Sequence, residues 1–373
     1  PYQNMTSELL AYAVGAHHGL FDCVDEQHQN GFVHRLEVRP EGDEEAVQNF
    51  LNQCVNEDDI DVLFDRACEE VSSIIENCMR LDFEDSELGF CIGLLSRLVT
   101  SAVMEGDRRD TAEFMNDITF APDPDNKLWE KLLIRIESKL QNLDSEMSIN
   151  RARRQISNQC RQAAENSSGI YRLNVPTGGG KTLSSLRYAL AHAKKWGKKR
   201  IIFVSPLLSI LEQNSKVIRS YIEDDSIILE HHSNVVLERD TKEWEQHELF
   251  AENWSAPIII TTLVQLLNAM FDGKTSSVRR FHALSDAVIV IDEVQTVPSK
   301  LLTMFNITVS FLAEISHTTI VLCSATQPCL ETVAHPIRVT VRDVIPYDYK
   351  LWEIFRRTNI CNAGAHQLND VPY

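Results

Sequence analysis

The sequence has little of what marks secreted or membrane proteins. Its nine cysteines form no Cys-x-x-Cys pair and are odd in number, which predicts neither a zinc ribbon nor a disulfide framework. Apolar runs such as 287–291 are far shorter than the roughly 20 residues that cross a bilayer. The first residues lack a secretory signal and also an initiator Met, so we expect a cytoplasmic piece of a longer protein, with no membrane span.

Charge is divided unevenly along the 373 residues. The net charge is −21 over residues 1–150 and +3 over residues 151–373, within a total of −18. Such asymmetry predicts two modules. The acidity argues against a general polyanion binder, because phosphate affinity comes from clustered Lys and Arg. Any contact with nucleic acid is therefore expected from local patches in the second part.

The hydrophobic periodicity changes near residue 150. Apolar residues recur at a spacing of three to four in segments 7–16, 46–55, 60–78, 88–104 and 127–140, which predicts helices. Later, short β-rich runs alternate with helical stretches, at 171–175, 200–205, 257–262, 287–291 and 318–324. Strands that alternate with helices predict a mostly parallel, doubly wound sheet.

A glycine-rich loop follows the first of these strands. It reads Pro176-Thr177-Gly178-Gly179-Gly180-Lys181-Thr182 and precedes a helical pattern. Strand, glycine loop and helix N-terminus together make an anion site, since backbone N–H groups converge there and the helix dipole favours negative charge. Lys181 is expected to reach the terminal phosphates of ATP, and Thr182 to hold Mg²⁺. Val175 replaces the first glycine of the strict GxxxxGK[ST] pattern, and the form present resembles the superfamily 2 helicases.

An acidic pair follows the fully apolar strand at 287–291. Asp292 and Glu293 are expected at the carboxyl end of a central parallel strand, beside the phosphate loop. There Asp292 is predicted to hold Mg²⁺, and Glu293 to orient or deprotonate the attacking water.

Three further blocks keep the order found in helicases. They lie at the ends of the second, third and fifth predicted strands, and their candidate DNA-contacting residues are Ser205, Pro206, Thr262, Ser324 and Thr326. Such groups bind single-strand phosphates without reading sequence. Each block alone is equally typical of a helix cap. Gln155, before the loop, is either an adenine contact or a solvated side chain.

A histidine pair in the helical part carries a second resemblance. His17 and His18 lie between Gly15 and Gly19, and by themselves such pairs are more often structural. Upstream of a superfamily 2 motor with the sequence Asp292-Glu293-Val294-Gln295, however, the pair resembles the CRISPR-associated helicase-nuclease of type I interference. The segments 104–111 and 229–233 resemble further blocks of that family.

The resemblance implies an ATP-dependent DNA helicase coupled to a metal-dependent single-stranded DNA endonuclease. His17, His18 and Asp107 are then ligands of a divalent transition metal, and single-stranded DNA and the CRISPR RNA-guided surveillance complex are partners in antiviral defence. The implied domains are the C-terminal part of an all-α HD-type nuclease domain (1–145), a first RecA-like lobe (146–345), and a linker or the start of a second lobe (346–373). An upstream His-Asp dyad and helicase motifs V and VI are not found, so we expect a fragment impaired in both activities.

Two alternatives remain open from the residues alone. Another superfamily 2 DNA translocase or repair helicase with an unrelated helical domain keeps the ATP chemistry and loses the metal site. A non-catalytic fragment that only binds its partners keeps neither, although the intact loop and acidic pair argue against it.

Overall fold

A seven-stranded sheet forms the centre of the chain in the computed structural model, which describes residues 4–20, 31–32, 42–116, 123–141, 146–232, 251–330 and 332–356. Every pairing between the described strands is parallel, in the order β3-β4-β2-β5-β6-β1-β7. The strands are β1 (Ile170–Asn174), β2 (Arg200–Ser205), β3 (Ile228–His231), β4 (Ile258–Thr262), β5 (Ala287–Asp292), β6 (Thr319–Ser324) and β7 (Val341–Asp343). The predicted parallel α/β sheet is confirmed, and the two edge strands β3 and β7 are additions to the prediction.

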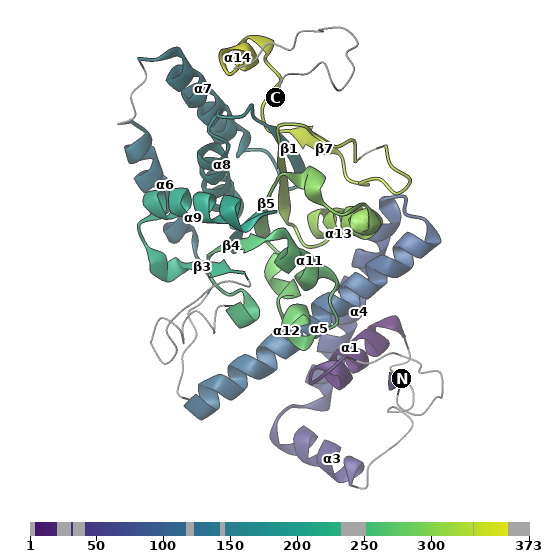
Figure 1. The fold of residues 1–373 in the computed structure, drawn as a ribbon. Coiled ribbons are helices and arrows are strands. Elements are labelled where there is room, and N and C mark those ends of the chain that lie inside the picture. Colours follow the sequence, from purple (N-terminus) through teal and green to yellow (C-terminus); the bar gives the residue numbers. More distant parts are fainter. Residues whose placement is uncertain are drawn as a thin grey trace, which may run out of the picture.

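Alternate strand residues enter two separate apolar cores, because successive side chains of a strand point to opposite faces. Ile201 and Phe203 of β2 pack with α6 (Asn126–Gln141), α7 (Ser148–Ala163), α8 (Lys181–Trp196) and α9 (Leu208–Ile222). Ile202 and Val204 pack with α11 (Leu263–Phe271) and α13 (Leu302–Glu314) on the other face. Figure 1 shows these two helical layers on either side of the strands.

The N-terminal part is helical, as predicted. Its elements are α1 (Met5–Ala16), α3 (Asp43–Gln53), α4 (Glu57–Arg80) and α5 (Asp85–Asn116). Helix α5 runs twelve residues beyond the predicted end at Met104, since the polar stretch that follows contains no proline and its Gly106 is accommodated inside the helix. Residues 357–373, which belong to the expected linker or start of a second lobe, lie outside the described residues.

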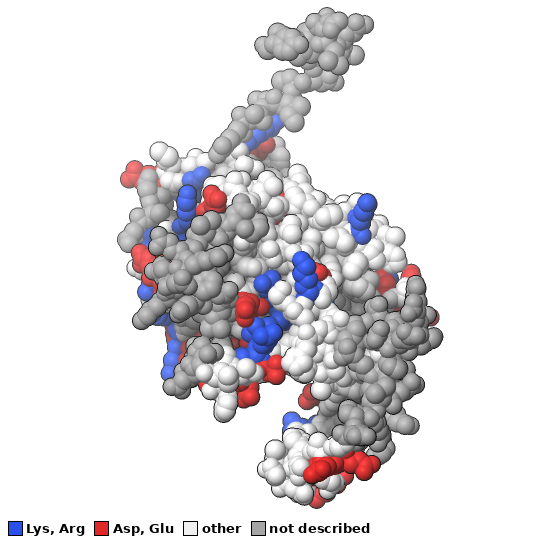
Figure 2. Space-filling view, turned by 60° about the horizontal axis from the view of Figure 1, so that its bottom comes forward, with Lys and Arg blue, Asp and Glu red and all other residues white. Residues whose placement is uncertain are grey.

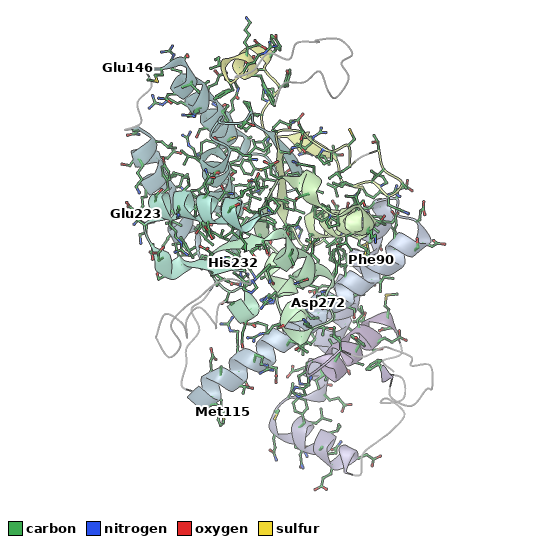
Figure 3. All side chains as sticks on the ribbon, viewed as in Figure 1. Phe90, Met115, Glu146, Glu223, His232 and Asp272 are labelled. Carbon is green, nitrogen blue, oxygen red and sulfur yellow. The ribbon has the colours of Figure 1, made fainter. Side chains whose placement is uncertain are left out.

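Helix α5 packs along the sheet domain rather than standing apart. Leu94 and Leu95 are 3% exposed and share an apolar core with α11 and α13. Arg97 donates to the carbonyl oxygens of Ala269 (2.9 Å) and Asp272 (2.7 Å) at the end of α11. In Figure 3 Asp272 lies between Phe90 and Met115, which mark the two ends of α5. Helix α5 is also long and apolar enough to cross a membrane, but Leu94, Leu95 and Arg97 pack it against the sheet domain.

Buried ion pairs fix the helix at two more points. Glu105 accepts hydrogen bonds from Arg279 (2.9 Å) and Asn253 (2.7 Å), and both side chains of the ion pair are 9% exposed. Near the start of the helix Glu87, whose side chain is 1% exposed, pairs with Arg338 at 2.8 Å. Two short helices, α12 (Thr275–Arg279) and α14 (Tyr349–Ile354), are also present. Single 3₁₀ turns occur at Asp225–Ile227, Phe281–Leu284, Val294–Thr296 and Ser299–Leu301.

Candidate functional site

The glycine loop joins β1 to α8 and depends on the absence of side chains. Gly178 and Gly180 have φ angles of +84° and +83°, a region that favours glycine. A Cβ added at Gly179 would lie 2.7 Å from Cγ1 of Val175 and 2.9 Å from the carbonyl oxygen of Pro176. The loop therefore closes tightly and leaves the backbone at the N-terminus of α8 open to an anion.

The lysine that opens α8 meets the acidic pair at the end of β5. The Nζ atom of Lys181 lies 2.5 Å from Oδ1 of Asp292 and 2.6 Å from Oε1 of Glu293. Burial by itself lowers the pKa of Lys181, but the two carboxylates outweigh it and raise that pKa. Burial likewise raises the pKa of Glu293, and hydrogen bonds from Lys181 and Gln295 bring it below its usual value. Lys181 and Glu293 are thus charged at neutral pH.

Asn214 of α9 connects the loop to two strand ends. Its Oδ1 accepts a hydrogen bond from the hydroxyl of Thr182 at 2.8 Å, while its Nδ2 lies 3.2 Å from Oγ of Ser205 and 3.5 Å from Oδ2 of Asp292. The sequence analysis missed Asn214. It lies nine residues beyond the end of β2, and only the fold of α9 against α8 brings it to the site.

A chain of hydrogen bonds continues from the acidic pair to the end of β6. Gln295 donates to Oε2 of Glu293 at 2.7 Å, and the hydroxyl of Ser324 lies 2.8 Å from Oε1 of Gln295. The backbone N–H of Thr326 donates to Ser324 at 2.9 Å. Blocks that lie more than 140 residues apart, from the loop at residue 181 to residue 326, therefore form one connected site.

The donors present suit a nucleotide with a hard divalent cation. The hydroxyl of Thr182 and the carboxylate of Asp292 are oxygen ligands of the type that Mg²⁺ prefers. Lys181 and the loop backbone supply the positive side that phosphate needs. The structure brings together Lys181, Thr182, Asp292 and Glu293, next to the remaining predicted loop residues Pro176, Thr177, Gly178, Gly179 and Gly180.

The five predicted DNA contacts differ in exposure. Ser205 and Ser324 are 1% and 0% exposed, and their hydroxyls bond within the site just described. Thr262 caps α11 by accepting from the backbone of Gln265 at 3.3 Å. Thr326 is exposed and Pro206 is half-buried. DNA contact by these residues stays a prediction.

Arg153, rather than Gln155, is the residue of α7 that hydrogen-bonds to the loop. Arg153 of α7 donates to the carbonyl oxygen of Gly178 at 2.8 Å, and both Arg153 and Gly180 line a cavity of about 930 Å³. Gln155 lines a different cavity, with Gln159 and Gln162. On the face drawn in Figure 2, Lys and Arg side chains lie beside Asp and Glu side chains near the middle rather than forming one basic field.

The predicted metal ligands also lie together. Ligand atoms of His17, His18 and Asp107 are all within 4.8 Å of one another, although the residues come from the end of α1 and from α5. Nδ1 of His17 donates to the carbonyl oxygen of Val14 at 2.5 Å, which leaves Nε2 with its lone pair free for a cation. Two imidazoles and one carboxylate are ligands that suit transition metals.

Comparisons with known proteins give a family match that spans this site. Residues 154–334 match the family DEAD/DEAH box helicase. A curated relative, "CRISPR-associated nuclease/helicase Cas3" of Haloferax volcanii, is 26% identical over 182 residues, which cover 43% of this chain and 19% of the relative.

Two solved structures of T. fusca Cas3 share the fold. The structure with ATP gives a TM-score of 0.50 at 16% identity and covers 87% of this chain and 37% of that one. The structure with ADP gives 0.50 at 15% identity and covers 87% and 38%. The chain thus spans well under half the length of these Cas3 relatives.

Proposed function

We propose that residues 146–345 form the first RecA-like lobe of an ATP-dependent DNA helicase or translocase. The premise is that this chain is similar to Cas3, at 26% identity, and that its residues 154–334 match the DEAD/DEAH box helicases. The observation that supports this most strongly is the meeting of Lys181, which follows β1, with Asp292 and Glu293 at the carboxyl end of β5. Open α/β sheets bind the phosphates of a nucleotide, with their cation, at the carboxyl ends of the strands.

Each side chain has one role in this proposal. Lys181 leaves its two carboxylate partners and binds the terminal phosphates, because a polyphosphate offers it more negative charge. Asp292 and Thr182 hold Mg²⁺, which, when bound, neutralises charge on the phosphates. Glu293 takes a proton from water as the water oxygen attacks the γ-phosphorus and ADP leaves. Gln295 holds the carboxylate of Glu293 in place.

Binding of a fluorescent ATP analogue to the chain tests this proposal. With Mg²⁺ present, Lys181→Ala should weaken binding by at least about tenfold, since it removes a charge-assisted contact worth about 1.5–3 kcal/mol. Lys194→Ala is the matched control, because Lys194 lies on the same helix and only pairs with Glu130 on the surface. Equal affinity of wild type and Lys181→Ala would rule the proposal out.

A second activity, metal-dependent cleavage of single-stranded DNA, is supported by the cluster of His17, His18 and Asp107. A transition metal held there would activate water for attack on a phosphodiester. Helix α5 carries Asp107 only two residues from the buried ion pair of Glu105, so the packing of α5 on the lobe positions this ligand.

Mn²⁺ titration followed by calorimetry tests the cluster independently of cleavage. His17→Ala should weaken Mn²⁺ binding by at least about tenfold, the lower bound for loss of even an indirect partner of a metal. His317→Ala, a change at an exposed histidine, is the control. Unchanged Mn²⁺ affinity in His17→Ala would leave the chain as a superfamily 2 motor without a nuclease site.

The proposal for the partners is supported by the likeness to a curated relative that is named a CRISPR-associated nuclease/helicase. We propose that this chain acts in the cytoplasm on single-stranded DNA, with a CRISPR RNA-guided surveillance complex. Thr262, Thr326 and Pro206 lie at the carboxyl ends of β4, β6 and β2 and are the proposed contacts. Fluorescence anisotropy with labelled single strands should show weaker binding for Thr326→Ala, and equal binding by wild type and variant would remove this contact.

A further inference from the structure

The carboxamide of Asn214 touches three parts of the candidate site at once. It accepts a hydrogen bond from the hydroxyl of Thr182 in the loop at 2.8 Å and donates one to the hydroxyl of Ser205 in β2 at 3.2 Å. Its Nδ2 also lies 3.5 Å from Oδ2 of Asp292. Pairs of these residues are 32, 9 and 78 positions apart, so no local element accounts for the arrangement. One side chain thus bridges the loop and two strand ends.

The surroundings fix which way the amide points. Its Nδ2 faces a hydroxyl oxygen and a carboxylate oxygen, both acceptors, whereas Oδ1 faces the hydroxyl of Thr182. The reverse orientation would place Oδ1 against the carboxylate of Asp292 and repel it. The cavity that these side chains line has a volume of only about 10 Å³, no more than one water needs, so the side chains pack closely around the amide.

We infer that Asn214 is a positioning residue for the Mg²⁺ that accompanies the nucleotide, an inference that rests on the proposed function. The hydroxyl of Thr182 has one proton and two lone pairs. By accepting that proton, Asn214 turns the lone pairs toward the loop, where the cation of a bound nucleotide would lie. By donating toward Oδ2 of Asp292, it leaves Oδ1, the atom that contacts Lys181, as the oxygen for the cation.

If Asn214 only stabilised the fold of the site, its loss would weaken nucleotide binding with and without Mg²⁺ alike. The phosphates bind to the loop backbone and Lys181, which Asn214 does not contact in the hydrogen bonds described. Loss of Asn214 should therefore spare nucleotide binding without metal and weaken only the part that Mg²⁺ adds. Groups that hold a metal ligand in place are worth about 10–100-fold in metal affinity.

The experiment measures the Mg²⁺ concentration that half-saturates the enhancement of fluorescent ATP-analogue binding, with EDTA as the metal-free reference. Asn214→Ala should raise this concentration about tenfold and leave the affinity in EDTA unchanged. Glu212→Ala, a change at an exposed residue two positions earlier in the same helix, should match wild type in both. Should Asn214→Ala fail to fold, Asn214→Ser, which keeps a small polar group at the position, replaces it.

A double-mutant cycle with Thr182→Ala decides the route. If Asn214 acts through Thr182, adding Asn214→Ala to Thr182→Ala should shift the Mg²⁺ dependence much less than it does in wild type. Wild-type Mg²⁺ dependence in Asn214→Ala, or full additivity with Thr182→Ala, overturns the inference while the proposed function stands. Absence of nucleotide binding by wild type in both EDTA and Mg²⁺ overturns the two together.

Discussion

The ion pair between Glu105 and Arg279 gives the sharpest prediction about stability. Arg279→Met leaves the Glu105 carboxylate, 9% exposed, with Asn253 as its remaining donor in the hydrogen bonds described. Removing one partner of a buried pair costs about 3–5 kcal/mol. Because Asn253 still donates, we expect about 3 kcal/mol. The second partner of Arg279, Glu252, is 54% exposed and adds little.

Urea unfolding measures this cost as a lower midpoint at an unchanged slope. Arg80→Met is the control, because Arg80 and Glu76 form a pair in which both side chains are about 70% exposed. The double variant Glu105→Leu with Arg279→Met should cost clearly less than Arg279→Met alone, since no charge is then left buried. A loss below about 1 kcal/mol for Arg279→Met, or full additivity in the double variant, would refute the reasoning.

Two other positions give independent predictions. Gly179→Ala should abolish binding of the fluorescent ATP analogue, because its Cβ would lie 2.7 Å from Val175; wild-type binding would show that the loop relaxes at little cost. His192 is fully buried, and burial together with the charge of Lys198 lowers its pKa from 6.5 to about 4. As the pH falls, the unfolded chain binds a proton at His192 before the folded chain does. The contribution of His192 to the free energy of unfolding is therefore complete above pH 6.5 and is lost as the pH falls toward 4, by about 3 kcal/mol in total. Measured by urea unfolding, the free energy of unfolding of His192→Gln should lack this part of its pH dependence. If this free energy fell with pH as steeply as that of wild type between pH 6.5 and 4, the prediction would be wrong.

Local patterns in the sequence predicted much of this site. The glycines before Lys181 and the apolar strand before Asp292 are contiguous motifs, and the parallel order of the strands places both at one edge of the sheet. The five internal strands were predicted to within one or two residues for the same reason: each is a short apolar run between helices. The edge strands β3 and β7 have four and three residues, too short for a periodic pattern.

Contacts between distant segments carried no such signal. Glu105 and Arg279 are 174 positions apart, and each alone is an ordinary polar residue. Asn214 sits on an amphipathic helix where an exposed or half-buried polar side chain is expected. Only the packing of α9 on α8, and of α5 on the lobe, makes these residues partners. The meeting of His17 and His18 with Asp107 was expected only through a family resemblance, not through spacing.

Hydrogen exchange with and without a non-hydrolysable ATP analogue and Mg²⁺ tests the central claim most directly. If one nucleotide bridges the loop and the acidic pair, backbone amides in residues 176–184 and 291–296 should be protected together, and Lys181→Ala should lose both effects. Protection of the loop with no change at 291–296, or no protection of either segment, would contradict a shared ATP site.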